Sequence, residues 1–115
     1  MGFDISERYN CVVIEFSGNV MGGPDAVRLN EKLHDLIENN QLNVVIDLLN
    51  VKFMNSSGLG MLIGALTTMK KAGGDLRICN AGEKIRSLLT ITKLITVFKH
   101  YQSLDKAIES FKEDE

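Results

Sequence analysis

Residues 44–60 read VVIDLLNVKFMNSSGLG, and this stretch decides the fold. Its first six residues, 44–49, form an almost continuous apolar run, which predicts a buried strand. After the two serines, apolar residues recur over 59–66 at the spacing of one face of a helix. The chain is therefore expected to pass from a buried strand through a short polar turn into a helix that begins near Ser57.

The serines of this turn lie beside the free N–H groups of a helix N-terminus, where a negative charge is stabilised. One interpretation is that Asn55 or Ser56 caps the helix, as these residue types commonly do. The other is that one hydroxyl accepts a phosphate, which adds about −1.5 to −2 charges and changes the surface that a partner meets. The residues alone favour capping.

The composition is that of an ordinary globular protein. The chain has 115 residues, 44% of them hydrophobic and 24% charged, which predicts one domain over residues 1–115. A net charge of −2 and a pI of about 5.7 give no reason to expect binding to nucleic acid or to an anionic membrane. There is no signal-peptide pattern and no apolar run of membrane-spanning length, so a cytoplasmic location is expected.

The two cysteines, Cys11 and Cys79, each lie in a strand-like apolar run. Neither has neighbours at metal-ligand spacing, and a disulfide is not expected in a cytoplasmic chain. The sequence therefore predicts two buried free thiols, no metal site and no cofactor.

Upstream of the central stretch, the sequence predicts a hairpin followed by a helix. Residues 3–7 and 11–16 form two antiparallel strands, and 17–19 is expected to end the sheet. Pro24 occupies the first turn of a helix with a regular apolar stripe, which closes at 39–41.

Downstream, the helix after the serines is expected to run over about 57–72 and to stop at two glycines, 73–74. Gly60 and Gly64 each cost this helix roughly 1 kcal/mol relative to alanine. We expect such a pair to mark close packing of the helix on the sheet rather than on a partner.

The remainder of the chain adds smaller elements. The sequence predicts a strand at 76–79, a short helix around 85–89, a last short strand at 96–98 and a helix capped by Ser103. The order β-β-α-β-α-β-α-β-α predicts an α/β fold, with a mixed sheet of four to five strands and about four helices packed against it.

Residues that could perform catalysis are sparse, and an enzyme is not expected. A nucleophilic serine needs a nearby base, but neither His34 nor His100 has an acid placed to orient it, so surface histidines are expected. Gly18 and Gly23 have the separation of a phosphate-binding loop, but Pro24 stands where that loop needs a lysine.

Three segments together resemble the signature of the STAS family, and in particular of bacterial anti-sigma factor antagonists. They are Val45-Ile46-Asp47-Leu48, Val51-x-Phe53-Met54 and Ser56-Ser57-Gly58-Leu59-Gly60. The length, the element order and the closing Ser103-x-x-x-Ala107 helix agree, so the resemblance covers essentially the whole chain.

The resemblance implies a regulator that is not an enzyme. Unphosphorylated members bind an anti-sigma factor that is also an ATP-dependent serine kinase, and so release the sigma factor. The kinase ends this interaction by phosphorylating the serine just before Gly-Leu-Gly, and a metal-dependent phosphatase restores it. By this resemblance Ser57 is the phosphoacceptor. The implied partner-binding residues are Asn55, Ser56, Ser57, Gly58, Leu59 and Gly60.

One position departs from the pattern. Phosphorylatable members typically have an aspartate before the serine pair, where this chain has Asn55, which keeps the capping ability but lacks the charge. The alternative function is therefore a STAS protein-interaction module that is not phosphorylated, as in stressosomes or lipid-trafficking systems. A third, a small hydrolase using Ser56 or Ser57, requires a histidine near the hydroxyl. A homodimer through exposed apolar positions such as Met21 or Met61 is left open.

Overall fold

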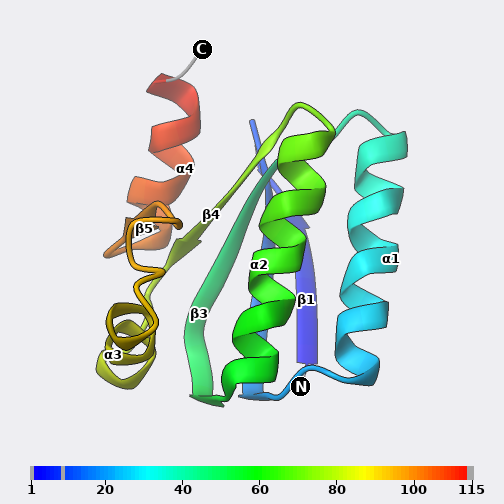
Figure 1. Ribbon diagram of the computed structural model, residues 1–115. Helices are drawn as coiled ribbons and strands as arrows, with labels where there is room; N and C mark the ends of the chain where they lie inside the picture. The colour runs from blue at the N-terminus through cyan, green and yellow to red at the C-terminus, as the bar shows by residue number, and fades with distance from the viewer. Residues whose placement is uncertain (1, 9, 114–115) are drawn as a thin grey trace.

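The computed structural model, which describes residues 2–8 and 10–113, has the predicted element order (Figure 1). Along the described residues the elements are β1 (Gly2–Glu7), β2 (Val12–Val20), α1 (Pro24–Glu38), β3 (Asn43–Met54), α2 (Ser56–Lys71), β4 (Asp75–Cys79), α3 (Glu83–Ile91), β5 (His100–Tyr101) and α4 (Leu104–Glu113).

The sheet is mixed, as predicted. Its strand order is β1-β2-β3-β4-β5, with β1 antiparallel to β2 and every other neighbouring pair parallel. A helix crosses over between each pair of consecutive parallel strands, as parallel pairing requires. The three connections that follow β2, β3 and β4 consequently emerge at one edge of the sheet, the lower edge in Figure 1.

Side chains alternate between the two faces of the sheet and build two cores. On the face covered by α1 and α2, the sheet contributes Val12, Ile14, Val44, Ile46, Leu76 and Ile78. On the other face, α4 covers a smaller cluster that contains Cys11, Val13, Val45 and Cys79. The central strand β3 is thus buried on both sides, as its apolar run predicts.

A buried cation fastens α4 to the sheet. Arg77 on β4 is 3% exposed and its guanidinium lies 4.0 Å from the centre of the Phe111 ring. The same group donates to Asp75 Oδ2 at 3.1 Å and to Ser110 Oγ at 2.6 Å. The sequence analysis did not single out this arginine.

The hairpin is confirmed, but its second strand is longer than predicted. β2 does not end at 17–19; it continues to Val20 alongside the end of β3, with Asn19 opposite Phe53 and Val20 opposite Met54. Irregularities in the register, at 15–17 and 18–19, accommodate the polar residues and the glycine. The predicted polar turn after residue 49 is likewise strand, because β3 continues to Met54.

The last strand was misplaced by the sequence analysis. The strand is His100–Tyr101, whereas residues 96–98 form a turn in which Phe98 is buried in the larger core. An apolar side chain that packs into a core from a turn gives the same local pattern as a short strand. The predicted cap of the final helix is confirmed, since Ser103 Oγ accepts the Lys106 N–H at 3.2 Å.

The prediction of two surface histidines holds for His34, which is exposed, and is wrong for His100. His100 is partly buried, and its Nε2 accepts the Ala81 N–H at 3.2 Å. An accepting nitrogen requires the neutral ring. Burial, and to a lesser extent the Arg86 charge, lowers the pKa of His100 from its ordinary value.

Because the folded pKa of His100 lies below the unfolded value of about 6.5, the unfolded chain binds more protons as the pH falls. We expect the free energy of unfolding to decrease as the pH falls through and below 6.5. Urea denaturation between pH 5 and pH 8 measures this slope. His100→Gln should reduce this slope; an unchanged slope in that variant would contradict the assignment.

Candidate functional site

Asn55 caps the helix that follows the central strand. Its Oδ1 accepts the Gly58 N–H at 2.8 Å, and its carbonyl accepts the Leu59 N–H at 2.9 Å, the first turn of α2. Of the two alternatives left by the sequence, the cap is Asn55 and not Ser56. The capping bond satisfies one of the otherwise unpaired donors of the helix start.

The serine hydroxyls are not used by the cap. Ser56 and Ser57 are the first two residues of α2 and both are exposed. Within residues 2–8 and 10–113, neither serine hydroxyl has a hydrogen-bond partner in the protein. Two hydroxyls therefore face solvent at the positive end of a 16-residue helix whose first turn carries no acidic side chain.

Gly58 allows the start of α2 to lie directly against β2. A Cβ built on Gly58 would lie 2.0 Å from the Val20 carbonyl oxygen, a distance that no side chain can adopt. The same carbonyl accepts the Asn55 N–H at 3.3 Å. The absence of a side chain at residue 58 thus sets the position of the cap and of the serines relative to the sheet.

A second glycine, Gly22, supports the turn from the β2–α1 connection. It is buried with φ of +79°, and a Cβ there would lie 3.0 Å from the Ser57 carbonyl oxygen. The contact between Gly22 and the serine turn could not be inferred from the sequence, because residues 22 and 57 are distant in the chain and only the fold brings them together.

A buried carboxylate, Asp47, forms hydrogen bonds to the neighbouring part of β3 and to the connection between β4 and α3. Asp47 on β3 is 5% exposed, and its Oδ1 accepts the Leu49 N–H and the Asn80 Nδ2–H, each at 3.0 Å. Asn80 has φ of +58° and begins the β4–α3 connection. Asp47 therefore links the backbone of β3 to the first residue of that connection through hydrogen bonds.

The expectation for Gly60 and Gly64 is wrong. A Cβ on either glycine would meet nothing within 4 Å, so neither packs closely on the sheet. Both line a hollow of about 360 Å³ between α1 and α2. Met61, expected to be exposed, is only 7% exposed, whereas Met21 is 46% exposed.

The described residues offer little for catalysis. His100 is engaged with a backbone N–H, His34 lies exposed on α1, and no hydrogen bond joins either serine to a histidine in the described chain. Residues 2–8 and 10–113 contain no group of three or more His, Cys, Asp and Glu side chains that could hold a metal ion. No helix among these residues is long and apolar enough to cross a membrane.

The two cysteines are buried free thiols, as predicted. Burial raises the pKa of Cys11, and burial together with the adjacent Asp47 carboxylate raises the pKa of Cys79 to about 12. Both side chains consequently stay protonated at neutral pH and lack the thiolate that a nucleophile requires.

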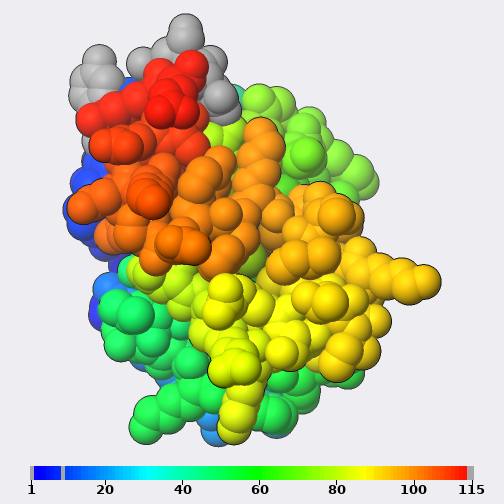
Figure 2. Space-filling view, turned by 90° about the vertical axis from the view of Figure 1, so that its left-hand side faces the viewer, coloured from blue at the N-terminus to red at the C-terminus, as the bar shows by residue number. Residues whose placement is uncertain are grey.

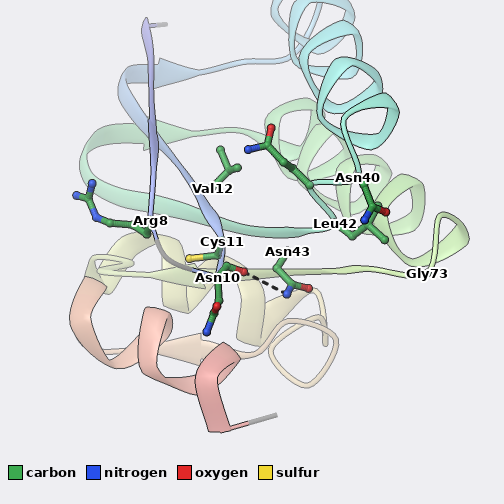
Figure 3. Close-up of a pocket in the computed structure, with 9 residues that line it drawn as sticks. Arg8, Asn10, Cys11, Val12, Asn40, Leu42, Asn43 and Gly73 are labelled. Carbon is green, nitrogen blue, oxygen red and sulfur yellow. Dashed lines mark hydrogen bonds between the residues drawn. The ribbon is translucent and has the colours of Figure 1, made fainter. Parts of the chain in front are cut away.

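A separate hollow of about 460 Å³ lies near the start of β2 (Figure 3). Its described walls are residues 8 and 10–12 on one side and residues 40–43 and Gly73 on the other. The two sides are linked where Asn43 Nδ2 donates to the Asn10 carbonyl at 3.3 Å. β2 and β3 begin here, so the hollow lies at the amino-terminal ends of these strands. Ser57 lies at the opposite end, after the carboxyl end of β3. Its described lining residues include the side-chain amides of Asn10, Asn40, Gln41 and Asn43 and the guanidinium of Arg8.

The glycines of α2 permit a matched test of this geometry. Gly58→Ala should destabilise the fold by roughly 1–3 kcal/mol, because the new methyl group overlaps the Val20 carbonyl. Gly60→Ala adds the same methyl group in open space and should stabilise by up to about 1 kcal/mol through helix propensity. Chemical denaturation of both variants measures the difference; equal effects would contradict the close contact at Gly58.

The comparisons with known proteins agree with this architecture. The model of the STAS domain family matches residues 3–107. An anti-sigma-B factor antagonist of Bacillus subtilis (strain 168) is 33% identical over 91 residues, which are 79% of this chain and 82% of the relative.

Solved structures share the fold. A crystal structure of a putative anti-sigma factor antagonist from Thermotoga maritima has a TM-score of 0.84 at 19% identity and covers 96% of this chain and 94% of its own. The Bacillus cell fate determinant SpoIIAA in its phosphorylated form has a TM-score of 0.73 at 18% identity, covering 95% and 98%. With the family model spanning nearly all of its elements, this chain belongs to the STAS domain family and is related to the bacterial anti-sigma factor antagonists.

Proposed function

We propose that residues 1–115 form one cytoplasmic STAS domain that acts as an anti-sigma factor antagonist. In its unphosphorylated form it binds an anti-sigma factor with serine kinase activity, and phosphorylation of Ser57 ends the interaction. A metal-dependent serine phosphatase returns it to the binding form. It is a binding protein and not an enzyme, and it needs no cofactor.

One observation carries the proposal: the Ser57 hydroxyl is exposed at the start of α2 in a chain of this family. A kinase must reach a free hydroxyl, and the capping bond from Gly58 to Asn55 does not occupy it. The relative from Bacillus subtilis is by name an antagonist of an anti-sigma factor, and the structural neighbour SpoIIAA is known in a phosphorylated form.

The position of Ser57 also explains how a phosphate acts without unfolding the domain. A dianion at a helix N-terminus is stabilised by the helix dipole and by free N–H groups, by about 0.3–1 kcal/mol for an exposed charge. The capping bond of Asn55 stays in place. The change is therefore confined to the surface that the anti-sigma factor contacts.

The partner surface that we propose is the turn itself. It comprises Asn55, Ser56, Ser57, Gly58, Leu59 and Gly60. Gly58 and Leu59 are buried, so their contribution is to hold the shape of the turn, while the exposed Ser56, Ser57 and Gly60 supply the contacts. A partner that packs closely on Ser57 has no room, and no solvation, for two added negative charges.

The test is incubation with the cognate anti-sigma factor kinase and ATP, followed by mass spectrometry of the phosphorylated peptide. We expect one phosphate, on Ser57. Ser57→Ala should keep full affinity for the kinase in the presence of ATP, and Ser57→Asp should weaken binding by roughly tenfold or more. Ser56→Ala is the matched control and should still be phosphorylated. A phosphate found only elsewhere, or none, would overturn the switch.

A second candidate function rests on Asn55. It is a STAS interaction module that is not phosphorylated, as in stressosomes or lipid-trafficking systems, because Asn55 lacks the charge that phosphorylatable members carry there. Asn55→Asp distinguishes the two, since it keeps the cap and adds that charge. A kinase that phosphorylates Asn55→Asp but not the wild-type chain would favour the second function.

A further inference from the structure

An apolar groove lies beside the serine turn, between the end of β3 and α3. This β3–α3 groove has a volume of about 550 Å³. Its apolar walls are Phe53 and Met54 of β3 and Ile85, Leu88 and Ile91 of α3. Figure 2 faces this part of the molecule and shows the yellow side chains of α3 against the green side chains of the β3–α2 region.

Two large apolar side chains of the groove are exposed to solvent rather than buried in the core. Phe53 is 48% exposed and Ile91 is 78% exposed. An adjoining hollow of about 490 Å³ also includes Ile91 and adds Ile95, among polar residues of α3. Burying such surface gains about 25 cal/mol per Å², and exposed apolar patches of this kind mark interaction sites.

The distance from the groove to Ser57 is short. Met54 lines the groove and Ser57 follows three residues later, which limits their separation to about 11 Å even for an extended chain. A standard protein interface buries about 800 Å² on each partner, a patch with a radius of roughly 16 Å. The exposed serine turn alone is too small for such a patch, so an interface centred on Ser57 extends over its surroundings.

We propose that the β3–α3 groove is the apolar part of the surface that binds the anti-sigma factor kinase. This inference rests on the proposed function. It adds the location of the apolar contacts that would supply the binding energy for the kinase. The hollow between α1 and α2 is equally near in sequence, but none of its described lining residues is a large, exposed apolar residue. Aromatic and aliphatic anchors near the centre of an interface contribute most of the affinity.

The charge of the groove defines the chemistry of its occupant. The rim carries one acid and one base, Glu83 and Lys84, which leaves no net charge to attract an ion. The groove therefore suits uncharged apolar side chains of the kinase. It also strengthens the switch, because a phosphate on Ser57 would have to be desolvated beside an apolar contact.

The experiment uses the anti-sigma-B factor of Bacillus subtilis, the target by name of the 33% identical relative, as the probe. Its affinity for the full chain is measured by titration calorimetry, and phosphorylation of Ser57 by steady-state kinetics. We expect Phe53→Ser and Ile91→Ser together to raise Kd and KM by roughly tenfold or more while kcat is kept, because the groove contributes uniform binding.

The controls separate the groove from the switch. Ile5→Ser removes an apolar residue of comparable exposure, 41%, from the edge strand β1 and should leave Kd and KM unchanged. Thermal unfolding of each variant verifies the fold. A groove variant with wild-type Kd, while Ser57→Asp still weakens binding, overturns the groove alone. A wild-type chain that is neither bound nor phosphorylated by the probe overturns the partner assigned to the groove here, whereas the proposed function is overturned by the absence of a phosphate on Ser57 with the cognate kinase.

Discussion

The contact on which the rest of the site depends is that between Gly58 and the last residue of β2. Only a residue without a side chain can lie against the Val20 carbonyl, and that carbonyl also accepts the Asn55 N–H. The same carbonyl oxygen therefore positions two residues of the turn, Asn55 by a hydrogen bond and Gly58 by close packing. These contacts fix where α2 begins relative to the end of β2. The positions of the cap, of the exposed serines and of the first turn of α2 depend on that starting point.

The fold could be predicted from the sequence because its signals are local. The buried run of β3, the stripe of α1 and the glycines after α2 each specify an element without knowledge of the others. The ends of β2 and β3 could not be predicted in this way. Residues 17–20 contain a glycine and two polar residues, and residues 50–54 mix polar with apolar side chains. Both segments become strand because they pair with each other. The strand β5 has two residues and depends wholly on β4.

In the candidate site too, the features that depend on local sequence could be predicted and those that depend on tertiary contacts could not. The serine turn and its cap were accessible to sequence reasoning, because a hydroxyl pair before an apolar helix has a local physical meaning. The choice of Ser57 over Ser56 came from the family resemblance. Gly22, Asp47 and Asn80 were not accessible, since each acts on residues that only the fold brings near. The misinterpretation of Gly60 and Gly64 has the reverse cause. A glycine pair in a helix shows that side chains are absent, but not which face of the helix uses the space.

Asn55 separates two properties that an aspartate would combine. As a cap, the amide oxygen serves as well as a carboxylate, and the bond to Gly58 is formed at 2.8 Å. As a charge, an aspartate beside Ser57 would repel an added phosphate and would also offer a cationic kinase residue a partner. A neutral cap removes both effects. Under the proposed switch, the phosphorylated domain would be easier to form energetically, while the recognition of Ser57 would lose an ionic contact. More of the binding energy would then come from uncharged surface, such as the exposed Phe53 and Ile91 of the proposed groove.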